Sequence, residues 1–263
     1  GAMTNDSSWI LVNHVSYVIP SEQVYETYIE SVAIDNRIQD TSAMYGPFKM
    51  QNGTMNKGFT EGMNMMREGG EATFIFTSEL GYGSTNTGDI PAYSSLKYEL
   101  QLLEILGDDI EAYEAAKIVA YTDTIAGVET AFDTVDNVNM YYVIDESTDG
   151  PPVAIDSTIK VAYKGYLIDG RVFDESADGS GISFTVGDPE SGIIPGWPLG
   201  LENFKEGEKG RLIIPYQLGY GERGQYTSQG NVSIPPYETL VFDVEVLSVY
   251  PEDDDDEHPD PEE

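Results

Sequence analysis

Residues 218–221 read Leu-Gly-Tyr-Gly, and the same four residues stand in the same order at 80–83. Four further segments recur in chain order around this pair, each as a weaker echo. They are 35–42 with 169–176, 57–59 with 195–197, 90–91 with 234–235, and 96–99 with 240–243. The separation between the copies grows from 134 to 144 residues along the chain, which a few loop insertions explain better than chance matches. We therefore predict a duplicated domain.

The composition is that of a β-rich chain with room for two domains. The 263 residues suffice for two domains of ordinary size, and 40% hydrophobic residues suffice for packed cores. Tyr (18), Gly (27) and Pro (14) are abundant, a mixture that favours strands broken by turns over long helices. We therefore expect a fold rich in strands and turns.

Apolar periodicity separates the two copies. Apolar residues recur at helical spacing from Asp108 to about Ala126, just before Gly127. Strands are expected on both sides of this helix, including one at 10–19 and a β-rich stretch at 24–34. The chain ends in alternating proline and acidic residues, which cannot bury a core. The expected division is a first domain at 10–107, a helical connector at 108–138, a second domain at 139–250 and a disordered acidic tail at 251–263.

The net charge of −34 argues against some classes of partner. So acidic a chain repels phosphate backbones and anionic membrane surfaces, and we expect no nucleic-acid binding. Solubility is the simplest interpretation of the acidity. Calcium binding is the alternative, although no segment matches the loop pattern of the EF-hand. No apolar run is long enough to span a bilayer.

Cysteine and histidine usage narrows the chemistry further. The chain has no cysteine, which excludes disulfides, thiolate catalysis and cysteine-based zinc sites. Its two histidines, His14 and His258, lie far apart in the sequence. We therefore expect no metal and no cofactor.

An ordered set of motifs runs through the second copy. They are Val161-Ala162-Tyr163-Lys164-Gly165, Asp-Gly-Arg-Val-Phe-Asp-Glu-Ser at 169–176, Ile193-Ile194-Pro195-Gly196-Trp197, Gly219-Tyr220-Gly221, and Ile-Pro-Pro-Tyr-Glu-Thr-Leu-Val-Phe-Asp-Val-Glu at 234–245. With these motifs the second copy resembles the FKBP-type peptidyl-prolyl cis-trans isomerases over about residues 153–250. The resemblance implies an α+β fold of two FKBP-like domains, each a twisted antiparallel sheet wrapped around a short helix. In the second copy that helix would span about 198–204.

The resemblance also implies a pocket for X-Pro bonds. Carried over position by position, its catalytic set would be Tyr163, Phe173, Asp174, Ile193, Ile194, Trp197, Tyr220 and Phe242. Its substrate-binding residues would be Ile182 or Phe184, between which the register does not choose, with Ile234 and Tyr237. Trp197 would form the floor, and the Ile194 N–H and the Tyr220 hydroxyl would donate hydrogen bonds. Asp174 would orient Tyr163.

An apolar, aromatic set of this kind suits the reaction. Rotation about a peptide bond crosses a barrier of about 18–20 kcal/mol. No bond breaks and no proton moves, so neither a nucleophile nor a general base is needed. The twisted amide is less dipolar than the planar one, so a dry pocket binds it preferentially and lowers the barrier.

Two features depart from the family pattern. Many relatives carry an arginine soon after the Phe-Asp pair, whereas residues 177–180 read Ala-Asp-Gly-Ser. Arg171 and Arg223 are the candidates to replace it. The stretch from Tyr220 to Ile234 is also longer than usual, and we expect it to alter substrate access.

The same comparison predicts that the first copy keeps the fold and has lost the pocket. In it, Ile29 stands for Tyr163, Gln39 for Phe173, Met55-Asn56 for the isoleucine pair, Phe59 for Trp197 and Tyr98 for Phe242, while Asp40 and Tyr82 are kept. The amides of Gln39 and Asn56 would place polar groups in a pocket that works by being dry. We expect weak or absent isomerase activity there, and a second enzyme of shifted specificity is the alternative.

The expected function is a peptidyl-prolyl cis-trans isomerase that assists folding of proline-containing polypeptides, with a macrolide-type ligand competing for the same pocket. The alternative is a non-catalytic FKBP-like binding module or chaperone. Tandem units with an acidic tail also resemble exported lipoproteins of gram-negative bacteria. That resemblance implies a periplasmic or outer-membrane location and a lipid anchor on a cysteine outside the printed chain. Residues 1–3, Gly-Ala-Met, resemble a cloning remnant.

Overall fold

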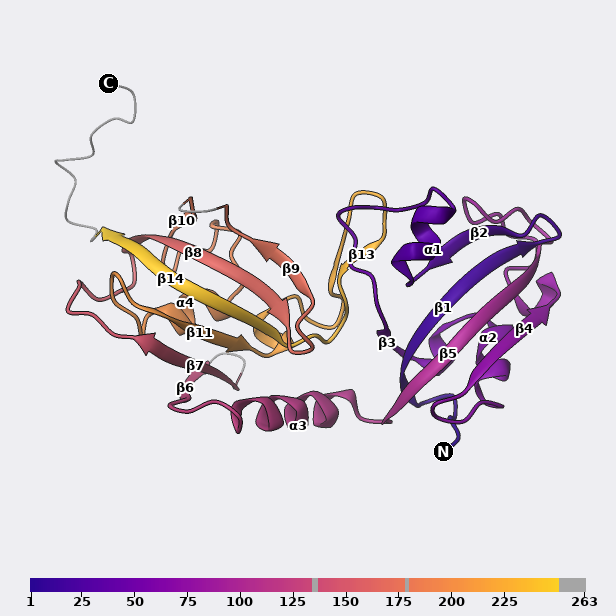
Figure 1. Ribbon diagram of the computed structural model, residues 1–263, viewed down its shortest axis with the longest axis horizontal. Coiled ribbons are helices and arrows are strands. Elements are labelled where there is room, and N and C mark those ends of the chain that lie inside the picture. The colour runs from indigo at the N-terminus through magenta and orange to yellow at the C-terminus, as the bar shows by residue number, and fades with distance from the viewer. Residues whose placement is uncertain (134–136, 178–179, 251–263) are drawn as a thin grey trace, which may run out of the picture. The chain divides into compact units, whose positions relative to one another are not determined.

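The computed structural model describes residues 1–133, 137–177 and 180–250, and the expected tail at 251–263 lies outside them. The chain divides into two compact units (Figure 1). The first comprises Gly1–Tyr113 together with Gln225–Pro235, and the second comprises Glu114–Gly224 together with Pro236–Glu263. Among the described residues, no helix is long and apolar enough to cross a membrane.

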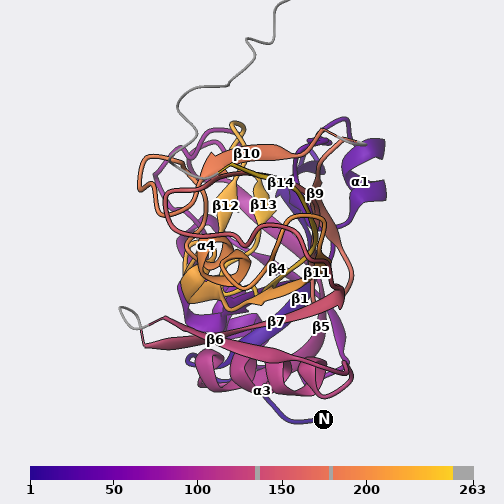
Figure 2. The ribbon, with the colours of Figure 1, turned by 90° about the vertical axis from the view of Figure 1, so that its left-hand side faces the viewer.

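The second unit is an antiparallel sheet curled around a short helix. Its strands run in the order β10-β8-β14-β11-β7-β6, and β9 pairs with β8. They are β6 (Glu129–Asp133), β7 (Val138–Glu146), β8 (Thr158–Leu167), β9 (Val172–Glu175), β10 (Ile182–Thr185), β11 (Lys209–Ile214) and β14 (Leu240–Tyr250). The helix is α4 (Gly196–Leu201), which contacts β6, β7 and β11 (Figure 2). The α+β, FKBP-like architecture predicted from the sequence is confirmed.

Two glycines let α4 lie close to the sheet. A Cβ on Gly196 would collide with the side chain of Ile214. A Cβ on Gly200 would lie 2.7 Å from Cε of Met140 and 2.8 Å from Cδ2 of Leu212, closer than carbon atoms approach without a shift. The small residues therefore hold α4, and Trp197 in its first turn, directly against the strands.

Helix α3 (Ile110–Thr122) covers the other face of this sheet. Ile118 joins a buried cluster with Ile213 of β11 and Val241 of β14. Successive residues of a strand point to opposite faces, and Ile214, next to Ile213, faces α4. From Glu114 onward α3 belongs to the second unit, where it packs on the face opposite α4.

The expected connector at 108–138 is therefore not one helical element. Its helix ends at Thr122, and β6 joins the sheet by pairing with β7. Periodicity located the helix correctly. The five residues of β6 are too few and too polar for alternation to reveal a strand.

Around its own short helix, the first unit repeats the part of this order formed by β8, β14 and β11 with the edge strands β9 and β10. The order is β2-β1-β5-β4, with β3 paired to β1. The elements are β1 (Trp9–Ile19), β2 (Gln23–Thr27), α1 (Glu30–Asp35), β3 (Phe48–Gln51), α2 (Lys57–Met63), β4 (Glu71–Phe76) and β5 (Ser95–Gly107), completed by the hairpin β12 (Gln225–Tyr226) and β13 (Val232–Ile234). Short 3₁₀ turns lie at Asn52–Thr54 and Ser78–Leu80, and at Tyr216–Leu218 in the second unit. The stretch expected to be β at 24–34 is a strand only to Thr27, after which α1 begins.

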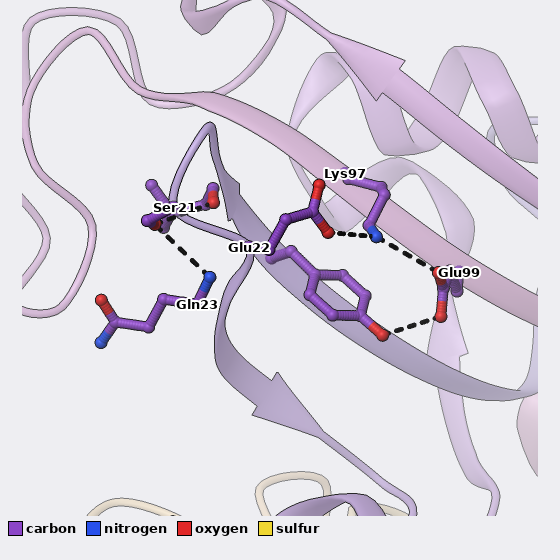
Figure 3. A network of polar contacts seen from close by, with 7 residues as sticks. Ser21, Glu22, Gln23, Lys97 and Glu99 are labelled. Carbon is purple, nitrogen blue, oxygen red and sulfur yellow. Dashed lines mark hydrogen bonds and ion pairs between the residues drawn. The ribbon is translucent and has the colours of Figure 1, made fainter. Parts of the chain in front are cut away.

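A charged network lies on the surface of β1 and β5 (Figure 3). Lys97 Nζ lies 2.6 Å from Glu22 Oε2, 3.3 Å from Glu99 Oε1 and 3.8 Å from the centroid of the Tyr17 ring. The Tyr17 hydroxyl donates to Glu99 Oε2 at 2.8 Å. Each charge here has a partner at the surface, so we interpret the network as support for the pairing of β1 and β5 rather than as a reactive site.

Strand pairing fixes the correspondence between the two units. The central strand of each unit lies between a long partner and a short edge partner: β14 and β9 flank β8, and β5 and β2 flank β1. Both short pairings carry a bulge, between Gly165 and Tyr166 in one unit and between Ser16 and Tyr17 in the other. The counterparts are therefore His14 and Tyr163, Ser16 and Gly165, Tyr25 and Phe173, and Glu26 and Asp174.

This register corrects the sequence comparison, which set residues 35–42 beside 169–176. Residues 28–47 form an insertion between β2 and β3 that is much longer than the link between β9 and β10. Ile29, Gln39 and Asp40 lie in this insertion, so none of them is the counterpart of a pocket residue. The comparison relied on Asp and Ser residues that the two segments share. It failed because the sequence alone does not show which strands pair.

Candidate functional site

The second unit gathers four aromatic rings around Trp197, which is 3% exposed. The ring centroids of Tyr163, Phe242 and Phe184 lie 5.1, 5.2 and 6.0 Å from that of the indole. Phe173 reaches the same cluster through Phe242, at 5.4 Å. Most of these pairs meet edge to face, the arrangement that aromatic quadrupoles favour. Five elements, β8, β9, β10, β14 and α4, thus contribute rings to one continuous aromatic cluster.

Gly165 makes room for two of these rings. A Cβ at this position would lie 2.7 Å from Cζ of Phe173 and 2.8 Å from Cε1 of Phe242. Any side chain would therefore push the rings away from β8. The sequence motif contains Gly165, but its spatial role became visible only once β8, β9 and β14 were seen to be neighbours.

Polar groups border the aromatic cluster on one side. The Tyr163 hydroxyl donates to Asp174 Oδ2 at 2.6 Å, a short, charge-assisted hydrogen bond. Burial raises the pKa of Tyr163, and its bond to Asp174 raises that pKa further. Burial and the negative charge of Asp174 also raise the pKa of Tyr220. Both phenols therefore remain neutral hydrogen-bond donors at physiological pH.

The remaining residues expected in the site lie in several places. Ile193 and Ile194 are half-buried just before α4, and the Ile194 carbonyl accepts the Trp197 N–H at 3.0 Å. Phe184, rather than Ile182 on the same face of β10, provides the ring against Trp197. Of the two arginines proposed to brace Asp174, Arg171 pairs with Asp169 at 2.8 Å.

Two of the expected substrate-binding residues have other surroundings. Tyr237 packs on Tyr216 with ring centroids 5.0 Å apart, and its N–H donates to the Gly221 carbonyl at 3.1 Å. Ile234 is buried on β13, in the hairpin that groups with the first unit. Neither is part of the aromatic cluster as described by its ring contacts.

The corresponding place in the first unit is polar. Tyr98, fully buried at the position of Phe242, accepts hydrogen bonds from the Tyr25 hydroxyl at 2.7 Å and from Asn56 Nδ2 at 2.9 Å. Phe59, at the position of Trp197, lies edge to face with Tyr98 at 5.7 Å. Hydrogen bonds thus cross the place where the second unit has the rings of Phe173 and Phe242.

A histidine and a glutamate replace the tyrosine and aspartate of the second unit. His14 Nε2 lies 3.5 Å from Glu26 Oε2, and the His14 side chain is fully buried. Burial acts to raise the pKa of Glu26, but the interaction with His14 outweighs it and leaves that pKa below its ordinary value. Tyr28, from the insertion, packs on His14 at 4.1 Å and on Phe48 at 4.5 Å. The sequence comparison missed this pair because it set Ile29 and Asp40 in these positions.

Comparison with protein families agrees with the repeated fold. The family model for FKBP-type peptidyl-prolyl cis-trans isomerases matches residues 20–103, within the first unit, and 150–247, which lie in the second unit apart from 225–235. Two relatives from Escherichia coli K12 are 41% and 40% identical: the FKBP-type isomerase FkpA over 129 residues, and the 22 kDa FKBP-type isomerase over 136 residues. The alignments cover 48% and 51% of this chain, and 41% and 61% of the two relatives.

A protist relative and a solved structure extend the comparison. FK506-binding protein 3 of Dictyostelium discoideum is 41% identical over 100 residues, 38% of this chain and 49% of that protein. The crystal structure of FkpA from Escherichia coli aligns with a TM-score of 0.41 and 35% identity, over 54% of this chain and 63% of that one. The chain thus spans between two fifths and two thirds of the lengths of these relatives.

Proposed function

Because the chain belongs to the FKBP-type peptidyl-prolyl cis-trans isomerase family, we propose that its second unit isomerises X-Pro bonds at the aromatic cluster around Trp197. The observation that carries the proposal is the edge-to-face assembly of Tyr163, Phe242 and Trp197, with Phe173 behind it. The substrates would be proline-containing polypeptides, and the role would be to assist their folding. A macrolide-type ligand would compete for the same surface.

The physical basis is preferential binding of the twisted amide. The planar X-Pro amide is strongly dipolar and is stabilised by water, whereas the twisted form has lost its conjugation. An aromatic, water-poor surface therefore favours the twisted form, and the barrier of about 18–20 kcal/mol falls by the difference in binding. Hydrogen bonds from fixed donors to the flanking carbonyls would hold the substrate in the productive orientation.

Each polar residue then has a defined task. We assign the donors to the Tyr220 hydroxyl and the Ile194 N–H, with the indole of Trp197 beneath the proline ring. Asp174 is a positioning residue, since its 2.6 Å bond fixes the Tyr163 ring that forms one wall. Neither carboxylate nor phenol has to exchange a proton during turnover.

The same physics argues against isomerase activity in the first unit. The Tyr25, Asn56 and Tyr98 hydrogen bonds and the buried pair of His14 and Glu26 make that region polar and already occupied by side chains. A polar site of this kind would stabilise the dipolar planar amide as well as the twisted form. It would therefore not lower the barrier between them. We propose that the first unit keeps the family fold in a non-catalytic role.

A matched pair of substitutions tests the assignment to the second unit. Tyr82 and Tyr220 are corresponding tyrosines of the repeated Leu-Gly-Tyr-Gly segments. Tyr220→Phe should lower kcat/KM on a proline tetrapeptide about threefold to tenfold, the value of one hydrogen bond, whereas Tyr82→Phe should leave it unchanged. Wild-type rates equal to the uncatalysed background, or full activity in Trp197→Ala and Phe173→Ala, would rule the proposal out.

The second candidate function is a non-catalytic binding module for proline-containing segments. It is favoured by the absence of the family's arginine at 177–180 and by the length of the stretch between Tyr220 and Ile234. A module of this kind would bind proline peptides without accelerating their isomerisation. Exchange spectroscopy on a bound peptide separates the two functions, because only an isomerase gives exchange cross-peaks between the cis and trans signals.

For the location we propose an extracytoplasmic compartment, the periplasm or the outer membrane through a lipid anchor. The support is the similarity of the chain to two FKBP-type isomerases of Escherichia coli, a bacterium that has a periplasm. Fractionation of the native host with an antibody against the second unit tests this. Recovery of the protein in the cytoplasm would contradict it.

A further inference from the structure

The insertion at 28–47 of the first unit contains a buried carboxylate, Asp40, which is 3% exposed. Its Oδ1 accepts the Ser42 N–H at 2.9 Å. Its Oδ2 accepts the Thr227 hydroxyl at 2.6 Å and Asn231 Nδ2 at 3.1 Å. These three donors, two of them on the hairpin β12–β13, compensate for the lost hydration of the charge.

The hairpin presents its donors in a fixed orientation. The Thr227 hydroxyl oxygen accepts the N–H groups of Gln229 at 3.2 Å and of Asn231 at 3.3 Å. With its lone pairs occupied in this way, the hydroxyl directs its own hydrogen at Asp40. The turn is closed by the Thr227 N–H, which donates to the Asn231 carbonyl at 2.8 Å, and Gly230 takes the positive φ of 86° that the turn needs.

A main-chain bond and a shared cavity accompany the carboxylate contact. The Met44 N–H, also in the insertion, donates to the Val232 carbonyl at 2.8 Å. Beside it lies a cavity of about 510 Å³, with Glu26 and Tyr28 on one side and Tyr226 on another. The hairpin is therefore held by side-chain and backbone bonds, and it forms part of the wall next to the His14 and Glu26 pair.

The hairpin comes from inside the other FKBP segment of the sequence. Residues 225–235 lie within the second matched segment, 150–247, between Tyr220 and Phe242. Gly221 and Gly224, with φ of 67° and 66°, stand just before it. One loop of the isomerase segment thus folds as part of the first unit.

We propose that the insertion at 28–47 is a docking site for the chain's own hairpin at 225–235, with Asp40 as its recognition residue. The ligand chemistry is a tight turn that offers one hydroxyl and one amide donor four residues apart. Through this site the first unit orders a loop that belongs to the isomerase segment of the same chain. This consequence rests on the proposed function, because it assumes that Tyr220, which precedes the hairpin by a few residues within the same segment, contributes to substrate binding.

The expected effect on catalysis follows from entropy. A loop that is already ordered loses less freedom when a substrate binds than a loose one does. Releasing the hairpin should therefore raise KM for a proline peptide about threefold or more, with kcat retained.

Hydrogen exchange on the full chain tests the docking itself. We compare the wild type with Asp40→Ala and Asn231→Ala, and use Asp89→Ala and Ser228→Ala as controls. Asp89 borders the same cavity and Ser228 is an exposed residue of the same turn. The amides of Met44 and of residues 225–234 should exchange about tenfold faster or more in the first two variants, as loss of a charged hydrogen bond predicts, and not in the controls. Equal exchange in Asp40→Ala and the wild type would overturn the docking site.

Additional variants and measurements distinguish the other possible results of this test. If Asp40→Ala fails to fold, Asn231→Ala still tests the contact from the hairpin side. Protection that disappears on dilution would place the hairpin of a second copy in the site and overturn the in-chain version. An inactive wild type would defeat the proposed function while leaving the exchange result standing. Faster exchange with an unchanged KM would overturn the proposed effect of hairpin docking on substrate binding.

Discussion

At the scale of single residues, the bond between Tyr163 and Asp174 is the clearest target. Tyr163→Phe keeps the ring that packs on Trp197 but removes the 2.6 Å hydrogen bond that fixes it. We expect kcat/KM to fall about threefold to tenfold and the unfolding free energy to fall by about 0.5–1.5 kcal/mol, the net value of one hydrogen bond. Peptide isomerisation rates and denaturant unfolding measure the two quantities.

The control for this substitution lies on the same strand. The Tyr166 hydroxyl donates to Asp243 Oδ1 at 3.0 Å, and its ring packs in the cluster beneath α3. Tyr166→Phe removes an equivalent bond on the face away from Trp197, so its kcat/KM should match the wild type. Equal losses in both variants would mean that the effect is a general weakening of β8.

The pH dependence of the reaction follows from the two phenols. Burial raises the pKa of Tyr163 and of Tyr220, so each stays protonated above the ordinary tyrosine value of about 10. A group whose folded pKa is raised stabilises the fold fully below its unfolded pKa, and that contribution is lost as the pH rises through the folded value.

We therefore expect kcat/KM to stay flat from about pH 6 to about pH 9.5, with a decline only above the ordinary tyrosine pKa. Line-shape analysis of a proline peptide by NMR measures the rate without a coupling protease that has its own pH profile. A titration step centred near neutral pH would show that an ionisable group takes part in the reaction.

At the scale of elements, α3 offers a test that separates stability from catalysis. Ile118 is 7% exposed and packs on Ile213 and Val241, on the face of the sheet opposite Trp197. Ile118→Ala should reduce the unfolding free energy of the second unit by about 2–5 kcal/mol, as core truncations do, without changing kcat/KM below the unfolding transition. Val119→Ala, at a residue that is 51% exposed, is the control.

The sequence predicted a helix or strand correctly wherever the residue pattern within that one element was sufficient to identify it. The helical spacing after Asp108 anticipated α3, and the apolar run at 10–19 anticipated β1 to within one residue. The resemblance to the FKBP family, carried over position by position, named the aromatic residues expected to share one site. Tyr163, Trp197 and Phe242 come from three elements and meet as expected.

The predictions that failed were those that required knowing which distant strands pair. The counterparts His14 and Glu26 bear no resemblance to Tyr163 and Asp174, so only the shared pairing pattern and the matching bulges identify them. The space that Gly165 leaves for two rings was invisible for the same reason. The assignment of 225–235 to the first unit depends on Asp40, which the letter comparison had placed in the wrong site.

At the scale of the whole molecule, charge is the dominant feature. The chain carries 47 acidic and 13 basic residues, a net charge of −34. A potential of this sign raises the local concentration of cationic chains and lowers that of anionic ones. We therefore expect proline segments flanked by Lys or Arg to associate faster than those flanked by Asp or Glu.

This preference should depend on salt. Screening shortens the reach of surface charge to about 10 Å at 0.1 M ionic strength and to about 3 Å at 1 M. Between about 0.02 M and 0.5 M salt, kcat/KM for a lysine-flanked peptide should fall about threefold or more, and that for a glutamate-flanked peptide should rise toward it. A neutral peptide of the same length controls for salt effects on the fold. Parallel responses of all three peptides would mean that the acidity serves solubility alone, since only electrostatic steering makes the sign of the substrate charge matter.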